Sequence, residues 1–148
     1  MLVNARILLA ILGLTWTHSA PFSDHAADSP QLPRFGVCQR EGAKIAGVKP
    51  VVPGKNIQSP RRTRSATPRY PDLPEGTTVS GIWIGEALVD TKGRVSQVWP
   101  IREVRLTPPF PPFNESIVAG IRQWEYEPLV VDSRAVPWCV TITVNIDF

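Results

Sequence analysis

Histidine is almost absent from this chain of 148 residues, which contains only His18 and His25. A Ser-His-Asp or Cys-His site therefore lacks its base, and a His-based metal site lacks its ligands. No phosphate-binding Gly-rich loop precedes a helical stretch. Glu86 and Asp90 fall on one face of an expected strand as a candidate carboxylate pair, but we interpret them as solvent-facing charges near a strand end. We therefore expect neither an enzyme nor a bound cofactor.

Long apolar runs are also missing. The run at residues 7–14 is shorter than the roughly 20 residues that a membrane-spanning helix needs. Arg6 precedes it, and small and polar residues follow as far as Ala20, which is typical of a secretory signal peptide. We expect residues 1–20 to be a signal peptide, with a short N-terminal anchor as the alternative. The mature chain would then begin between Pro21 and Asp28.

Cysteine is scarce as well, with only Cys38 and Cys139. Export would bring both into an oxidising compartment, where disulfides persist. A disulfide between them is one interpretation. Two unpaired thiols are the preferred one, because the sequence gives no distance between the two residues.

Acidic side chains are missing between residues 42 and 71, and basic ones are frequent there. The basic residues are Lys44, Lys49, Lys55, Arg61, Arg62, Arg64 and Arg69, whereas the chain from residue 72 onward has six basic and ten acidic residues. We expect residues 21–66 to be a basic, Pro-rich disordered linker, apart from a short strand near residues 48–52. The basic stretch at residues 44–69 favours an anionic partner, which for an exported chain is an envelope surface and not nucleic acid. The preferred alternative is a linker that its charges only keep extended.

The regular part of the pattern begins with a hairpin. Residues 81–90 are rich in β-forming side chains and are apolar on both faces, so this strand should be covered on both sides. Gly93 lies in a turn that requires a positive φ, and residues 95–102 form the returning strand. Pro100 cannot donate a ladder hydrogen bond, which indicates an edge or a bulge.

One helix is expected after the hairpin. The Pro-rich residues 103–113 cannot hold a helix, and Asn114 is the expected N-cap. Ile117, Ile121 and Trp124 then recur with helical spacing and predict one apolar stripe.

The chain finishes on its most regular strand. Apolar and polar residues alternate strictly over residues 140–148, which indicates a half-buried strand. No following segment must pair with a terminal strand, so one row of its amides and carbonyls is open to another chain. The order β-β-α-β, with an antiparallel hairpin, predicts an α+β two-layer sandwich whose single helix packs on one face of the sheet.

Several motifs, taken in order, resemble the C-terminal domain of the TonB energy-transducer family. They are Tyr70-Pro71, the strand after Gly81, VDTKGRV at residues 89–95, WEYEP at residues 124–128 and the terminal strand. The resemblance covers about residues 67–148, slightly more than half of the chain. The Trp-x-Tyr-x-Pro pattern between a helix and an edge strand is its most specific part.

The resemblance implies a periplasmic, non-enzymatic domain of a Gram-negative envelope that supports energised transmembrane transport. Such a domain captures a short extended peptide, the TonB box of an outer-membrane receptor, as a strand added beside its last strand. The expected partner-binding residues are Arg69, Tyr70, Pro71, Val140, Thr141, Thr143, Val144, Asn145 and Asp147. The alternative is a soluble envelope adaptor with the same fold and no transducer activity. A small secreted hydrolase or inhibitor is disfavoured by the missing histidines.

Overall fold

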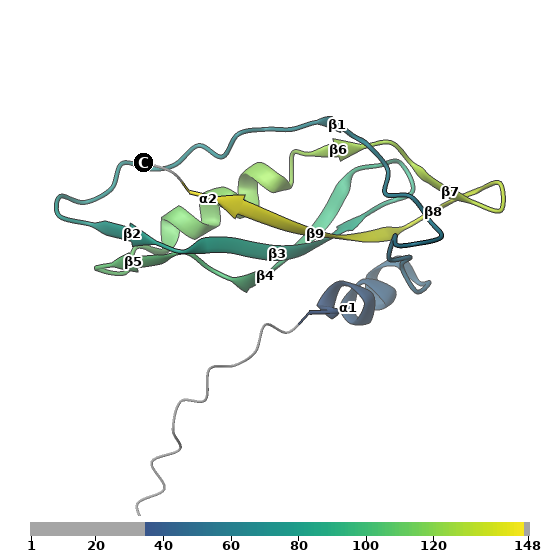
Figure 1. The fold of residues 1–148 in the computed structure, drawn as a ribbon, viewed down its shortest axis with the longest axis horizontal. Coiled ribbons are helices and arrows are strands. Elements are labelled where there is room, and N and C mark those ends of the chain that lie inside the picture. The colour runs from purple at the N-terminus through teal and green to yellow at the C-terminus, as the bar shows by residue number, and fades with distance from the viewer. Residues whose placement is uncertain (1–34, 147–148) are drawn as a thin grey trace, which may run out of the picture. The chain divides into compact units, whose positions relative to one another are not determined.

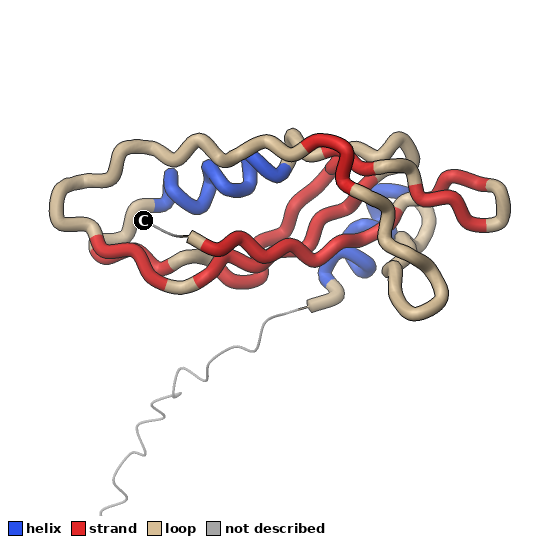
Figure 2. The backbone as a smooth tube through the Cα atoms, turned by 45° about the horizontal axis from the view of Figure 1, so that its top comes forward, coloured by secondary structure: helices blue, strands red, loops and turns tan. Residues whose placement is uncertain are grey.

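A computed structural model describes residues 35–146 of the chain. The expected signal peptide at residues 1–20 and the candidate site residue Asp147 lie outside the described residues. The described part is a mixed α+β structure with two helices and several antiparallel sheets (Figures 1 and 2). Its elements are α1 (Val37–Ala46), β1 (Arg62–Arg64), β2 (Thr78–Ser80), β3 (Ile82–Val89), β4 (Val95–Arg102), β5 (Arg105–Thr107), α2 (Pro111–Ile121), β6 (Glu125–Tyr126), β7 (Leu129–Val131), β8 (Arg134–Val136) and β9 (Trp138–Asn145). Within residues 35–146, no helix is long and apolar enough to cross a membrane.

The central sheet has the order β4-β3-β9, with both pairings antiparallel. The expected hairpin is confirmed, and Gly93 in its turn has a φ of 84°. β4 lies at one edge, and its register shifts where Arg102 and Pro100 face consecutive residues of β3, so the expected bulge is also confirmed. Shorter antiparallel pairs surround the sheet: β2 with β5, β1 with β6 and β7 with β8.

β3 is covered on both faces, as its composition predicts. Trp83, Ala87 and Val89 belong to the main buried cluster, which also contains Ile117 and Ile121 of α2. Leu88 points to the other face and packs with Cys38 and Cys139. In Figure 1, α2 and α1 accordingly lie on opposite sides of the sheet.

The start of α2 differs from the prediction. The helix begins at Pro111, with Phe110 as its N-cap, because a proline in the first turn has a suitable φ and loses no helical hydrogen bond there. Asn114 is therefore not a cap. It is buried, and its side-chain amide accepts from the backbone N–H of Val104 and donates to the Val104 carbonyl, each at 3.0 Å.

The expected disordered linker is wrong for residues 35–66. α1 packs near β3 and β4, Val51 forms a bridge with Trp138 of β9, and β1 pairs with β6. The sequence of this segment has no periodic apolar pattern that would predict these contacts, because α1 buries only Cys38 and Gly42. A close-packed glycine and a cysteine give no amphipathic signature.

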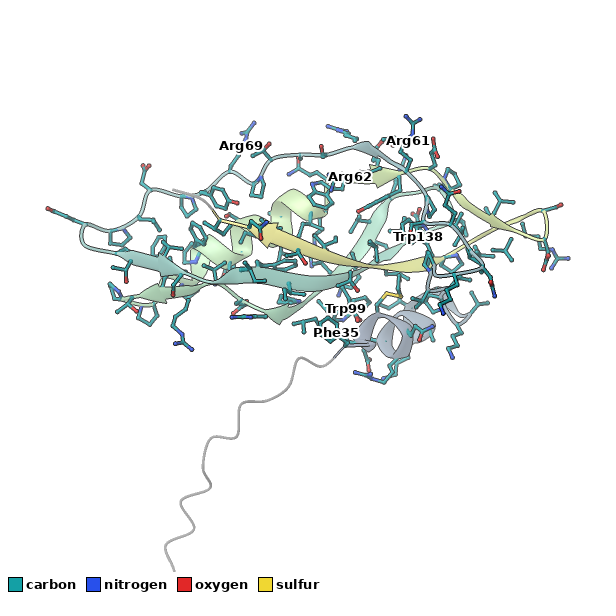
Figure 3. The ribbon with its side chains drawn as sticks, viewed as in Figure 1. Phe35, Arg61, Arg62, Arg69, Trp99 and Trp138 are labelled. Carbon is teal, nitrogen blue, oxygen red and sulfur yellow. A yellow bond between two sulfur atoms is a disulfide. The ribbon has the colours of Figure 1, made fainter. Side chains whose placement is uncertain are left out.

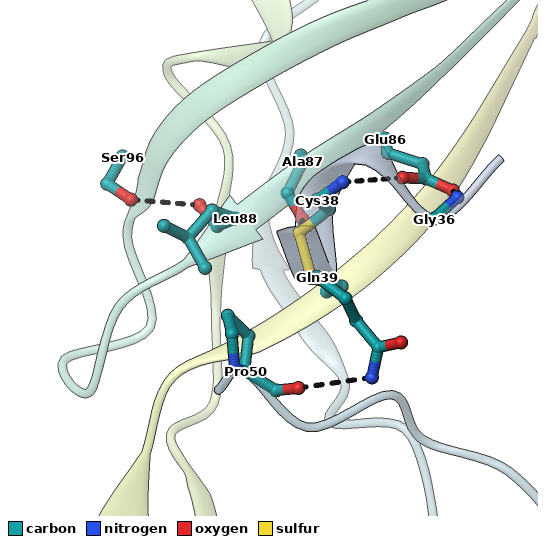
Figure 4. Close-up of a disulfide and its surroundings, with 9 residues drawn as sticks. Gly36, Cys38, Gln39, Pro50, Glu86, Ala87, Leu88 and Ser96 are labelled. Atoms are coloured by element: carbon teal, nitrogen blue, oxygen red, sulfur yellow. Dashed lines mark hydrogen bonds between the residues drawn. A yellow bond between two sulfur atoms is a disulfide. The ribbon is translucent and has the colours of Figure 1, made fainter. Parts of the chain in front are cut away.

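The expectation of two unpaired thiols is also wrong. Cys38 in the first turn of α1 and Cys139 in β9 form a disulfide across a sequence separation of 101 residues, with their Cα atoms 5.9 Å apart (Figure 4). Residues 35–66 fold against the sheet and thereby bring Cys38 close to Cys139, which the sequence alone does not show.

Candidate functional site

β9 has one paired side and one side that is mostly open. On one side it pairs with β3 along its whole length. On the other side, Val51 donates to the Pro137 carbonyl at 3.0 Å and accepts from the Cys139 amide at 2.8 Å. No other strand among the described residues pairs with this outer side.

The direction of the Cys139 amide fixes which later groups point outward. Hydrogen-bonding directions alternate along a strand, so Thr141, Thr143 and Asn145 direct their amides and carbonyls to the same side as Cys139. The side chains of these three residues are exposed. The backbone amides and carbonyls of Thr141, Thr143 and Asn145 form an outward row, which we call the open edge.

Val140 and Val144 occupy the alternate positions. Their backbone groups face β3, opposite Ala87 and Trp83, and their half-buried side chains pack against the main core. Of the strand residues expected to bind a partner, the structure therefore places Thr141, Thr143 and Asn145 on the open edge. Val140 and Val144 instead hold the strand in the sheet.

Arg69, Tyr70 and Pro71 belong to a segment that crosses α2. The Tyr70 ring stacks on Phe113, with ring centroids 4.8 Å apart. Burial raises the pKa of Tyr70. The preceding Pro68 lies so close to Gly120 that a side chain at residue 120 would contact it at about 3.0 Å. Arg69 is exposed on the same segment, which lies along the top in Figure 3.

The basic stretch is partly neutralised within the molecule. Arg61 contacts Glu127 at 2.8 Å, and Arg64 contacts Glu125 at 3.3 Å. The Arg62 guanidinium lies 4.1 Å from the centroid of the Trp124 ring, where a cation–π interaction is favourable. Three arginines expected to face an anionic partner thus contact β6 and the residues beside it.

Glu86 is not the solvent-facing charge that its position suggests. Its side chain is 6% exposed, and its two carboxylate oxygens accept from the backbone amides of Gly36 at 2.6 Å and Cys38 at 2.8 Å (Figure 4). It therefore caps the start of α1 from β3, where a negative charge is favourable. Asp90 has a different role, because it accepts from the amides of Lys92 and Arg94 in the hairpin turn.

A cavity of about 270 Å³ lies where Val51 leaves the edge of β9. Its lining includes Val52, Pro53, Glu86, Val140, Thr141 and both cysteines. Sequence reasoning missed this arrangement; the weak strand signal at residues 48–52 was its only trace. Within residues 35–146, no group of three or more His, Cys, Asp or Glu side chains is arranged to hold a metal ion.

The geometry of the open edge suits hydrogen bonding to an extended backbone, and the exposed threonine and asparagine side chains flank that row.

Comparison with protein-family models and with curated protein sequences finds no match for this chain.

Proposed function

We propose that this protein is a non-enzymatic binding module of the bacterial envelope that captures an extended peptide by strand addition along the open edge. The observation that carries the proposal is the outward row of backbone groups at Thr141, Thr143 and Asn145. An added strand would satisfy these groups, and its alternate side chains would supply selectivity. The position of β9 at the sheet edge, with exposed polar side chains on that row, supports this role.

The partner that we propose is the TonB box of an outer-membrane receptor, and the proposed compartment is the periplasm. The motifs at residues 67–148 that resemble the TonB C-terminal domain support this identification. Within the mixed fold, β3, β4, β9 and α2 would form the two-layer unit of that domain. The role would be linked to energised transmembrane transport.

The segment at residues 69–71 would contribute one contact in addition to the backbone row. Tyr70 stacks on Phe113 of α2, which fixes the path of this segment across the helix. Arg69 is exposed beside it and is available to an acidic side chain of a bound peptide. We therefore propose Arg69 as a contact outside the backbone row.

The test is an NMR titration of the full chain with synthetic TonB-box peptides from receptor plugs. Residues 67–148 alone are unsuitable, because they lack Cys38 and β1. We expect the amide shifts to concentrate on Thr141, Thr143 and Asn145. Thr143→Pro removes one outward donor and should weaken binding by about tenfold, or about 1.4 kcal/mol. Thr143→Ala keeps the amide and should bind like the parent chain.

Three results would contradict the proposal. Equal losses for Thr143→Pro and Thr143→Ala would assign binding to the side chain. Shifts confined to residues 44–69 that vanish at moderate salt would assign binding to the basic stretch and its anionic partners. The absence of any shift with every box peptide, while the protein stays folded, would favour the adaptor alternative.

A further inference from the structure

A groove of about 460 Å³ lies between the end of α1, the β3–β4 hairpin and β8. Most of its lining is aliphatic. The aliphatic residues that line it include Ile45, Val48, Leu88, Ala135 and Val136. None of the three residues of the open edge contributes to this groove, so it is a separate surface of the protein.

Large aliphatic side chains at this groove are exposed to solvent. Ile45 and Val48 are 58% and 56% exposed. Val130 is 59% exposed and lies directly opposite Ala135 in the β7–β8 pair, so the two side chains share one face of the hairpin. A cluster of exposed aliphatic side chains marks a surface that contacts a protein or a membrane.

The basic residues around the groove distinguish between these two kinds of partner. Four exposed basic residues lie on or beside the segments that line the groove, namely Lys49, Lys92, Arg94 and Arg134. None of them forms an ion pair within residues 35–146. Arg61 and Arg64, in contrast, are neutralised by Glu127 and Glu125. The unpaired positive charge is therefore concentrated near the exposed aliphatic side chains.

Acidic side chains only partly compensate this charge. Lys44 and Glu41 of α1 form an ion pair at 2.8 Å and cancel each other. Asp90 lines the groove, and Asp132 lies in the β7–β8 turn. Four positive and two negative charges leave a net charge of +2 around the groove.

We propose that this groove and the exposed side chains around it dock the protein on a bilayer that contains anionic phospholipids. Ile45, Val48 and Val130 enter the boundary between headgroups and acyl chains, and the unpaired basic residues contact lipid phosphates. A second copy of the chain fits this surface less well, because a symmetric contact would place the same net positive charge on both sides.

Docking at the groove leaves the open edge free. Pro137 lines the groove, whereas Thr143 lies six residues further along β9, which corresponds to about 20 Å in an extended strand. Lipid contact and strand addition therefore use different parts of the protein. The docking goes beyond the proposed peptide capture and does not depend on it.

The test is flotation of the full chain with vesicles of phosphatidylcholine, either alone or mixed with phosphatidylglycerol. We expect the affinity for the anionic vesicles to be at least tenfold higher. Arg134→Gln should weaken this binding by about fivefold, because it removes one positive charge near the lipid. Arg61→Gln is the matched control: it changes the net charge equally, at an arginine that Glu127 already neutralises, and it should bind like the parent chain.

The aliphatic contribution is tested by substitutions that leave the fold intact. Ile45→Ser and Val48→Ser replace exposed side chains, and each should weaken binding to the anionic vesicles by about tenfold. Val52→Ser is the matched control, because Val52 is 53% exposed but lines the cavity beside Cys139. Residues 1–34 are identical in all variants, so differences among the variants report on the groove.

Three outcomes would overturn the docking. Equal affinity for the two kinds of vesicle, or no flotation with either, would show that the basic residues select no lipid. A loss for Arg134→Gln without a loss for Ile45→Ser and Val48→Ser would assign the surface to an anionic polymer. Equal losses in the variants and their controls would place binding elsewhere. No receptor peptide is present in these assays, so failure of the docking and failure of peptide capture are distinguishable.

Discussion

At the scale of single residues, the turn glycine of the hairpin has two roles. Gly93 has a φ of 84°, and its carbonyl accepts from the Tyr126 amide. A Cβ at residue 93 would overlap the carbonyl oxygen of Tyr126. The hairpin turn therefore packs against β6 through backbone atoms, and only glycine allows this approach.

We expect Gly93→Ala to destabilise the protein by about 2–4 kcal/mol, because backbone strain and a steric overlap act together. The measurement is urea unfolding. Gly76→Ala is the matched control: Gly76 has a φ of 76° with no atom within 4 Å of an added Cβ, so only strain of about 1–2 kcal/mol applies. Equal losses in the two variants would mean that the turn does not contact β6 in solution.

Ionisation of Tyr126 should destabilise the folded protein at alkaline pH. Burial raises the pKa of Tyr126 above its ordinary value of 10.0, and the neighbouring Arg62 opposes the shift. The folded state thus holds this proton more tightly than the unfolded state. The resulting stability is fully present below pH 10 and is lost as the pH rises through the folded-state pKa.

Tyr126→Phe should therefore remove part of the decline in the urea midpoint above about pH 10. Tyr70→Phe is the companion variant, because burial also raises the pKa of Tyr70 while the stacking on Phe113 can persist. Curves for Tyr126→Phe that parallel the parent chain at every pH would show that ionisation of Tyr126 is not linked to folding.

At the scale of elements, Trp124 joins α2 to a segment distant in sequence. It belongs to the main buried cluster, its Nε1 donates to the Ala66 carbonyl at 2.9 Å, and Arg62 covers its ring. The apolar stripe predicts its burial. The sequence does not predict that residues 62–66 would cover it.

Trp124→Ala should cost about 3–5 kcal/mol of stability through the cavity that it leaves. Trp124→Phe keeps an aromatic ring but removes the donor to Ala66, so it should loosen β1 specifically. The Glu127 amide, which donates to the Arg61 carbonyl at 2.9 Å, reports this in hydrogen exchange, with Cys139 as the control amide. Unchanged exchange at Glu127 would show that β1 docks without Trp124.

The elements that could be predicted are those with a strong period. The apolar composition of β3, the alternation in β9, the turn at Gly93 and the helical spacing of Ile117 and Ile121 all correspond to observed elements. Trp124 was expected in the same helix, but α2 ends at Ile121, and Trp124 is buried in the main cluster from a position beyond the helix end. The predicted start of α2 is wrong, because the two prolines that were expected to prevent a helix lie in its first turn.

The candidate site was partly predictable for the same reason. Alternation predicts which residues of β9 face the core, so the exposure of Thr141 and Thr143 follows from the sequence. The row of outward amides depends on which side of β9 pairs with β3, and that is a matter of topology. A short strand near residues 48–52 was expected, but the pairing of Val51 with β9 and the burial of Glu86 were missed, because backbone bonds and a helix cap leave no periodic trace.

At the scale of the whole described part of the molecule, the segregation of charge along the sequence is partly cancelled in space. Arg61 and Arg64, from the basic half, contact Glu127 and Glu125 of the acidic half. Exposed pairs of this kind contribute little stability individually. Their effect is to lower the positive potential that residues 42–71 would have as a free chain.

A shortened chain should test how far the parts depend on one another. Residues 67–148 lack Cys38, α1 and β1, and loss of a disulfide that closes a loop of this size costs about 4–5 kcal/mol. Domains are typically stable by about 5–15 kcal/mol, so we expect this chain to be largely unfolded. A chain of residues 31–148 retains the compact unit and should match the full protein. Circular dichroism in urea distinguishes the two, and equal midpoints would show that residues 31–66 are dispensable for folding.

The long separation between the two cysteines also governs the order in which the molecule can be completed. As the chain is synthesised from its N-terminus, residue 38 appears 101 residues ahead of residue 139. α1 has only ten residues and is too short to persist as an isolated helix in water. It is thus the earliest of the described elements to be made, but its covalent attachment can form only after residue 139 has been made. Any polypeptide that terminates prematurely before residue 139 keeps Cys38 as an unpaired thiol, which chemically marks unfinished molecules.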